Sequence, residues 1–102
     1  MGIYLFDQYS LLHFSIGVVA FFFKVPLTYW IFLHILFEIV ENTQTGIYII
    51  NNYLPVWPGG KPKADSIINQ VGDTISAILG WVCAYLLNYY GSKYGWYEPH
   101  PI

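Results

Sequence analysis

The chain contains no arginine and few charged residues of any kind. Charged side chains make up 10% of its 102 residues, and the formal net charge is -2 at neutral pH. A soluble domain carries roughly a quarter charged residues, and a nucleic-acid-binding surface is rich in arginine and lysine. The composition therefore argues against a soluble domain, and we expect no nucleic-acid partner.

Cysteine is nearly absent, whereas apolar and aromatic residues are abundant. A single cysteine, Cys83, excludes an internal disulfide and a cysteine-based zinc site. Hydrophobic residues make up 56% of the chain and aromatic residues 21%, with a mean hydropathy of +0.45. A chain of this length forms one domain. We therefore interpret residues 1–102 as a single domain of an integral membrane protein, whose source membrane the sequence leaves open.

The hydropathy pattern predicts an all-α membrane protein with three transmembrane helices. A helix that crosses the hydrocarbon region needs about 20 residues, and suitable stretches run over residues 5–23, 27–43 and 65–90. Residues 44–64 are interrupted by prolines and glycines but remain apolar and aromatic, so we expect an interfacial helix or lid there. Residues 91–102 are expected to form a surface tail.

Ionisable residues interrupt the second apolar stretch at helical spacing. His34, Glu38, Glu41 and Asn42 occupy positions i, i+4, i+7 and i+8, so they share one face of a helix. The flanking residues are too apolar for a helix that turns its carboxylates to water. Because ionisable groups inside a membrane segment are costly and usually face the interior of a bundle, this face predicts a functional site.

The first and third stretches carry polar residues at a similar depth. Asp65, Asn69 and Asp73 are spaced i, i+4 and i+8 on the third, and His13 lies within the first. If the three helices run in alternating directions, these side chains and those of the second stretch fall in the same half of the bundle. We therefore expect one shared site, with residues 44–64 above it.

The chemistry of these side chains favours a divalent metal ion. A histidine nitrogen with carboxylate oxygens suits Mg²⁺, Mn²⁺ or Zn²⁺, and such an ion activates water or polarises a phosphoryl oxygen of a lipid headgroup. The predicted metal ligands are His13, Glu38, Glu41, Asp65 and Asp73. The predicted catalytic residues are Glu38, Glu41 and Asp73, with Asn42 and Asn69 as supporting polar groups.

Structural roles also fit several of these residues. Asp65 suits the N-cap of the third helix, and His34, which lies deeper, suits a hydrogen-bonded core position. Asn69 suits a hydrogen bond between helices. Under this interpretation the polar side chains hold the bundle together and bind no ligand.

Three short motifs follow one another along the chain. The first joins Asp7, Tyr9 and Ser10 to His13 and Gly17, the second is Glu38-x-x-Glu41-Asn42, and the third is Asp65-Ser66-x-x-Asn69-x-x-x-Asp73-Thr74. Their order resembles that of a family of small bacterial inner-membrane proteins whose reaction is not established, and it is distantly similar to the VanZ-like membrane proteins. The resemblance implies a helical membrane fold and a set of site positions, but no mechanism.

These observations lead to one leading hypothesis and two alternatives. The leading hypothesis is a small membrane enzyme or binding protein that uses a divalent metal and acts on a lipid or lipid-linked headgroup. The first alternative is a structural component of a larger assembly, such as a viral or organellar membrane. The second is a cation or proton pathway, which requires a homo-oligomer because three helices rarely enclose a pore.

Overall fold

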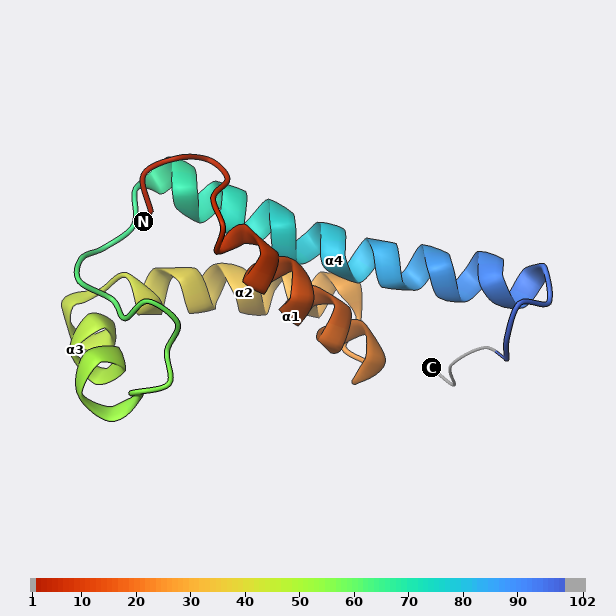
Figure 1. Cartoon of the computed structure of the whole chain (residues 1–102), viewed down its shortest axis with the longest axis horizontal. Helices are drawn as coiled ribbons and strands as arrows, with labels where there is room; N and C mark the ends of the chain where they lie inside the picture. Colours follow the sequence, from red (N-terminus) through yellow and green to blue (C-terminus); the bar gives the residue numbers. More distant parts are fainter. Residues whose placement is uncertain (1, 99–102) are drawn as a thin grey trace.

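The structure, a computed structural model, describes residues 2–98 and is built from helices. The helices are α1 (Ser10–Phe22), α2 (Leu27–Glu41), α3 (Gln44–Tyr53) and α4 (Ile67–Lys93). In Figure 1, α4 forms the long axis, α1 and α2 lie along its N-terminal half, and α3 lies beside the C-terminal end of α2. The C-terminal part of α4 extends past the ends of α1 and α2. Residues 99–102 of the predicted tail lie outside the described residues.

The expectation of three transmembrane helices is wrong. Within residues 2–98, only α4, with 27 residues, is long and apolar enough to cross a membrane. Helices α1 and α2 have 13 and 15 residues, which at ~1.5 Å per residue gives lengths of about 20 and 22 Å. Both are shorter than the ~30 Å hydrocarbon core of a bilayer. With a single candidate span, the arrangement of three spans under an interfacial lid does not hold.

Local hydrogen bonds make α1 and α2 shorter than the hydropathy pattern indicates. A turn at Asp7, whose Oδ1 accepts the N–H of Tyr9 at 2.9 Å, precedes α1 and delays its start to Ser10. Thr43 caps α3 by accepting the N–H of Gly46 at 3.0 Å, so α2 ends at Glu41. These turns consist of polar contacts within apolar stretches, and a hydropathy average does not detect them.

Ser66, not Asp65, caps α4. The Ser66 hydroxyl accepts the N–H of Asn69 at 3.1 Å, which satisfies one of the free donors of the first turn. The capping role considered for Asp65 is therefore wrong, and its carboxylate instead pairs with Lys61.

Small residues let α1 and α4 approach closely. A Cβ atom at Gly80 would fall on the carbonyl oxygen of Phe14, and one at Gly17 would fall on that of Ala77. The backbones therefore touch at this crossing, as small residues permit in membrane and soluble helix pairs alike.

Two tryptophans join α2 and the turn before it to α4. The indole N–H of Trp30 donates to the carbonyl oxygen of Ala77 at 3.0 Å, and that of Trp81 donates to Val25 at 2.8 Å. Because the Ala77 carbonyl also faces Gly17, the three long helices meet around one turn of α4. This contact brings the polar face of α2 opposite the first turns of α4.

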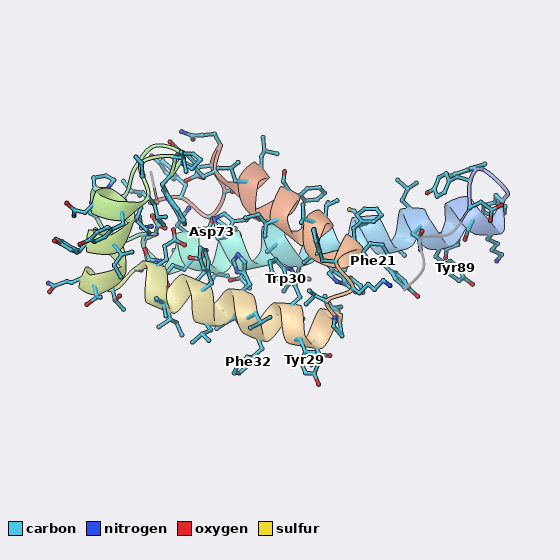
Figure 2. The ribbon with its side chains drawn as sticks, turned by 90° about the horizontal axis from the view of Figure 1, so that it is seen from below. Phe21, Tyr29, Trp30, Phe32, Asp73 and Tyr89 are labelled. Atoms are coloured by element: carbon cyan, nitrogen blue, oxygen red, sulfur yellow. The ribbon has the colours of Figure 1, made fainter. Side chains whose placement is uncertain are left out.

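The interior of the bundle is more polar than its exterior. Figure 2 shows Asp73 lying among the helices, whereas Tyr29 and Phe32 of α2 point away from them and are 66% and 69% exposed. The buried polar side chains of the described residues are Ser10, His34, Glu38, Glu41, Lys61, Asn69, Asp73 and Ser76. The buried hydrophobic ones are Ala20, Phe21, Ile50, Ala77 and Ala84. A soluble domain shows the opposite distribution.

The Gly80 contact predicts that even a methyl group destabilises the bundle. We expect Gly80→Ala to lower the free energy of unfolding by about 1–3 kcal/mol through overpacking, although alanine favours a helix over glycine by about 1 kcal/mol. Leu79→Ala, at an adjacent position that is 48% exposed, is the control and should change it by about 0.5 kcal/mol or less. Melting of the purified variants measures the two changes in stability. Equal stability of Gly80→Ala and the wild type would contradict the backbone contact between α1 and α4 at Gly80.

Candidate metal centre

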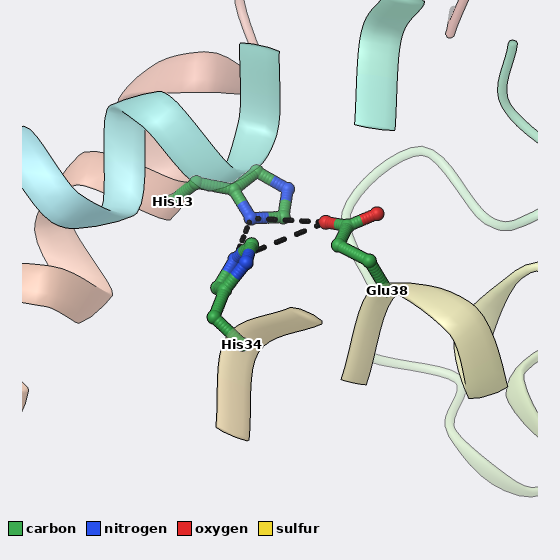
Figure 3. Close-up of side chains that lie close together, drawn as sticks. All are labelled: His13, His34 and Glu38. Atoms are coloured by element: carbon green, nitrogen blue, oxygen red, sulfur yellow. Dashed lines mark hydrogen bonds and ion pairs between the residues drawn. The ribbon is translucent and has the colours of Figure 1, made fainter. Parts of the chain in front are cut away.

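Two histidines and a glutamate from α1 and α2 converge on one point. His13 Nδ1 lies 2.9 Å from His34 Nε2, and Glu38 Oε1 lies 3.5 Å from the former and 3.8 Å from the latter. Figure 3 shows the three side chains pointing toward one another. His34 and Glu38 are one helical turn apart on α2, so the same face of that helix presents both.

These distances fit the ligands of one metal ion. A tetrahedral ion with metal–ligand bonds of about 2.1 Å separates its ligand atoms by about 3.4 Å, and the observed separations lie on either side of that value. Two histidines with one glutamate also form a ligand set known from catalytic zinc sites, where a fourth position stays open for water or substrate. The group of His13, His34 and Glu38 is thus able to hold a metal ion.

The remaining ring nitrogens of both histidines face oxygen atoms. His13 Nε2 lies 3.3 Å from Asp73 Oδ2, and His34 Nδ1 lies 3.2 Å from the hydroxyl of Thr74. Metal-bound histidines regularly donate their second N–H to a carboxylate, a carbonyl or a similar acceptor, which fixes the ring and its tautomer. Adjacent residues of α4 therefore orient one histidine from α1 and one from α2.

Burial shifts the pKa values of the histidine and the glutamate on α2 toward their neutral forms. Burial, with a smaller contribution from the neighbouring His13, lowers the pKa of His34 to about 4, so its imidazole is neutral at pH 7 and able to act as a ligand. Burial also raises the pKa of Glu38, and the charges of Glu41 and Asp73 raise it further. A divalent ion would reverse this effect by stabilising the carboxylate form.

Three buried carboxylate oxygens lack a hydrogen-bond partner among residues 2–98. They are Glu38 Oε1, Glu41 Oε2 and Asp73 Oδ1, and their residues are 3%, 6% and 2% exposed. Leaving a buried acceptor without a partner costs about 1–3 kcal/mol. These oxygens are therefore the positions at which a bound cation would contribute most.

Lys61 enters the same region from the segment between α3 and α4. Its Nζ lies 2.6 Å from Asp65 Oδ2 and 3.2 Å from Glu41 Oε1, and the residue is only 2% exposed. Asn51 of α3 holds its backbone, accepting the Lys61 N–H at 2.8 Å and donating to its carbonyl oxygen at 2.6 Å. Burial acts to lower the pKa of Lys61, but Asp65 and Glu41 outweigh burial and raise it. Lys61 is thus a fixed internal cation.

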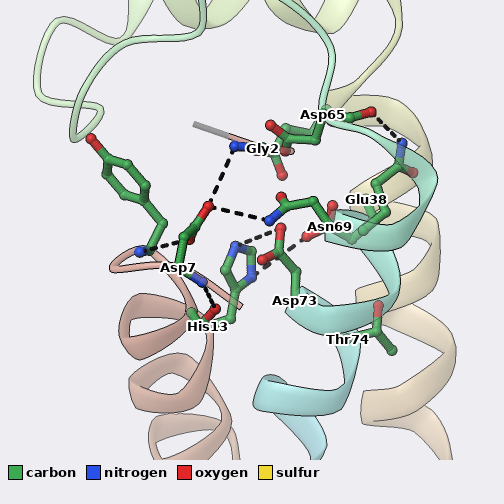
Figure 4. Close-up of polar contacts among 12 residues, drawn as sticks. Gly2, Asp7, His13, Glu38, Asp65, Asn69, Asp73 and Thr74 are labelled. Atoms are coloured by element: carbon green, nitrogen blue, oxygen red, sulfur yellow. Dashed lines mark hydrogen bonds and ion pairs between the residues drawn. The ribbon is translucent and has the colours of Figure 1, made fainter. Parts of the chain in front are cut away.

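The two asparagines hold the polar segments together. Asn42 donates to the Glu38 carbonyl oxygen at 2.8 Å and accepts the N–H of Asp65 at 2.7 Å. Asn69 donates to Asp7 Oδ2 at 3.2 Å and to the carbonyl oxygen of Tyr4 at 2.7 Å. Figure 4 shows Asn69 between Asp7 and the carboxylates of the site. Both asparagines join chain segments to the site, as supporting groups do.

A cleft of about 270 Å³ leads to this site from the surface. His13, Glu41, Lys61, Asp65 and Asp73 line its polar part. Leu12, Ile16, Val19, Phe37 and Trp57 line its apolar part, where the rings of Phe37 and Trp57 stack with centroids 6.1 Å apart. The cleft therefore presents charged groups at one part and hydrocarbon at another.

The structure brings together all seven site residues that the sequence analysis names. His13, Glu38 and Asp73 lie in direct contact, and Glu41 and Asp65 are joined through Lys61. Two members of the site, His34 and Lys61, were not among the predicted ligands. His34 also suited a core position, although its i, i+4 spacing to Glu38 was a signal that could have identified it. Lys61 gave no such signal because it lies in a loop after Pro58, Gly59 and Gly60.

The burial of Lys61 predicts a large loss of stability when its charge is removed. We expect Lys61→Met to lower the free energy of unfolding by about 3–5 kcal/mol, because Glu41 and Asp65 lose their cation while remaining enclosed. Lys63→Met removes the same charge at an exposed position two residues away and should change stability by about 0.5 kcal/mol or less. Chemical denaturation of both variants provides the measurement, and equal effects would contradict the buried ion pair.

No protein-family model, curated protein or solved structure matches the chain, so the side chains themselves carry the functional argument.

Proposed function

We propose that this protein is a membrane-associated metalloprotein that acts on the polar headgroup of a lipid or lipid-linked molecule. One observation carries the proposal: a largely buried group of two histidines and carboxylates, with oxygens that lack a hydrogen-bond partner among residues 2–98, presents His13, Glu41 and Asp73 to an otherwise apolar cleft. Zn²⁺ and Mn²⁺ suit this mixture of nitrogen and oxygen ligands best.

The distribution of side chains supports a membrane setting. Helix α4 passes the length and hydropathy test for a membrane span, and the large apolar side chains of α1 and α2 point outward, Leu11 being 70% and Phe32 69% exposed. In lipid such side chains need no protein cover, whereas ionisable groups gather in the interior. The proposal uses α4 as the one span and places α1 and α2 beside it without crossing.

The shape of the cleft supports a lipid-like ligand. Leu12, Ile16 and Val19 are spaced i, i+4 and i+7, so they form one apolar stripe along α1. A hydrocarbon chain lying on this stripe would bring its headgroup to His13 and Asp73. Ligand sites that are mostly apolar with a few convergent polar groups are typical of small-molecule recognition.

The same residues define the chemistry. A divalent ion in this setting activates water or polarises a phosphoryl oxygen. Glu41 lines the cleft with Oε2 unpartnered and is placed to accept a proton from water. Asp73 and Thr74 fix the two histidine rings, and Lys61 supplies a positive charge beside the headgroup position. This arrangement supports hydrolysis or binding of a phosphorylated headgroup as the proposed activity.

Metal binding is the first test. We expect Zn²⁺ or Mn²⁺ at 100 times its dissociation constant to stabilise the wild type by about 2.7 kcal/mol for each bound ion and to raise the melting temperature of His34→Gln by less than that of the wild type. Glu98→Gln, at an exposed carboxylate, is the control and should respond like the wild type. If the wild type binds no metal and both Glu41→Gln and Asp73→Asn melt earlier, the polar network is structural and the enzyme hypothesis fails.

Lipid binding is the second test. We expect Ile16→Trp, which fills the apolar part of the cleft, to reduce the amount of co-purified lipid several-fold in native mass spectrometry. Leu11→Trp places the same side chain on α1 at a 70% exposed position outside the cleft and should retain wild-type lipid. If both variants are folded and contain equal amounts of lipid, the cleft is not the lipid-binding site.

A further inference from the structure

Glu38 belongs to two groups of potential metal ligands. One is the group with His13 and His34, and the other joins Glu38 to Asp65 and Asp73. Within each group, one ligand atom per residue lies within 4.8 Å of the others. The two groups are therefore adjacent and share a single carboxylate.

Two carboxylates of the second group, those of Glu38 and Asp73, retain an oxygen without a hydrogen-bond partner among residues 2–98. Asp73 directs Oδ2 toward His13 Nε2 at 3.3 Å, while its Oδ1 has no hydrogen-bond partner within residues 2–98. Asp65 directs Oδ2 toward Lys61 at 2.6 Å, and its Oδ1 lies close to Gly2. Asp73 and Glu38 are 2% and 3% exposed, so bulk water does not compensate their charges. In Glu38, Oε2 accepts from Asn42 Nδ2 at 3.3 Å, so Oε1, which faces the two histidines, is the oxygen left for a bridging role.

Charge balance favours more than one ion once metal binding has ionised carboxylates such as Glu38 and Glu41, whose pKa burial raises. Four carboxylates, those of Glu38, Glu41, Asp65 and Asp73, surround a single ammonium group, that of Lys61. One divalent ion added to Lys61 leaves a net negative charge in a largely enclosed space. Burying an unbalanced charge is costly, whereas a second divalent ion with a bound hydroxide would bring the group to neutrality.

We propose that Glu38 bridges two divalent ions, the first bound by His13 and His34 and the second by Asp65 and Asp73. This inference rests on the proposed function and extends it to a binuclear centre. The second position offers only oxygen ligands, which suit Mg²⁺ or Mn²⁺, whereas the first mixes nitrogen and oxygen. Two ions about 3.5–4 Å apart stabilise both the attacking and the leaving oxygen in phosphoryl transfer, so the matching substrate class is a phosphate ester.

The cleft leads to the second position, and His13 is the ligand of the first position that lines it. Asp65 and Asp73 both line it, next to Lys61 and His13. A phosphoryl group entering along the cleft would therefore meet both ions and the ammonium group together. A phosphate diester and a phosphate monoester share this chemistry, and a lipid or a soluble molecule can supply either.

Manganese tests the proposal because Mn²⁺ fits both positions and is paramagnetic. The purified wild type, stripped of metal with a chelator and titrated with Mn²⁺, should bind two ions per chain. Two ions at this separation couple magnetically, so we expect the multiline electron paramagnetic resonance signal of an exchange-coupled pair. This readout needs no variant and is independent of activity.

Two variants separate the positions, with Glu98→Gln as the exposed carboxylate control. Asp65→Asn should bind one Mn²⁺ and show an uncoupled signal, while His34→Gln should lose the ion at the histidines and likewise lose the coupling. Circular dichroism establishes that each variant is folded. Inorganic phosphate and a short-chain phosphatidic acid, added in turn, should perturb the coupled signal if the centre receives phosphoryl groups.

The outcomes distinguish this inference from the proposed function. One ion per wild-type chain, retained in Asp65→Asn and lost in His34→Gln, would overturn the second position and leave the metalloprotein proposal intact. No bound ion at any concentration would overturn both. Two ions without magnetic coupling would place them apart and overturn the bridging role of Glu38.

Discussion

The enclosure of charged side chains within an apolar bundle is the constraint on which this structure depends. Glu38, Glu41 and Asp73 are almost fully buried, and among the described residues Lys61 is the one buried ammonium group near them. Buried charges persist only when partners offset their desolvation. The chain meets this requirement by bringing four segments to one place, so the contacts that neutralise charge also determine how α1, α2 and the segment after α3 meet α4.

Close helix packing makes this convergence possible. Gly17 and Gly80 allow α1 to lie against α4 at backbone distance, and the indole of Trp30 anchors α2 to the same turn of α4. Bulkier residues there would separate the helices by several ångströms, and the ring of His13 would no longer reach Asp73 and His34. The small residues and the polar site therefore depend on each other. The small residues let α1 approach α4, and the contacts among the polar side chains hold the two helices together.

The site combines an internal cation with buried carboxylate oxygens that lack a hydrogen-bond partner among residues 2–98. Lys61 balances Glu41 and Asp65 permanently because Asn51 holds its backbone in place. The carboxylates nearest the histidines receive no such partner. A purely structural network would be expected to satisfy all of its acceptors, whereas a site for a ligand leaves some of them free. This difference favours the ligand-binding interpretation over that of a packing element in a larger assembly.

The sequence by itself determined that polar residues at helical spacing would share faces, since the i, i+4 relation of His34 to Glu38 and of Asn69 to Asp73 follows from helix geometry alone. It also determined the apolar character of the outer surface. Tertiary structure decided the rest. The ends of α1 and α2 depend on the turns at Asp7 and Thr43, which made two expected spans too short. The place of Lys61 depends on a contact with Asn51 ten residues away across a loop, and no periodicity encodes such a contact.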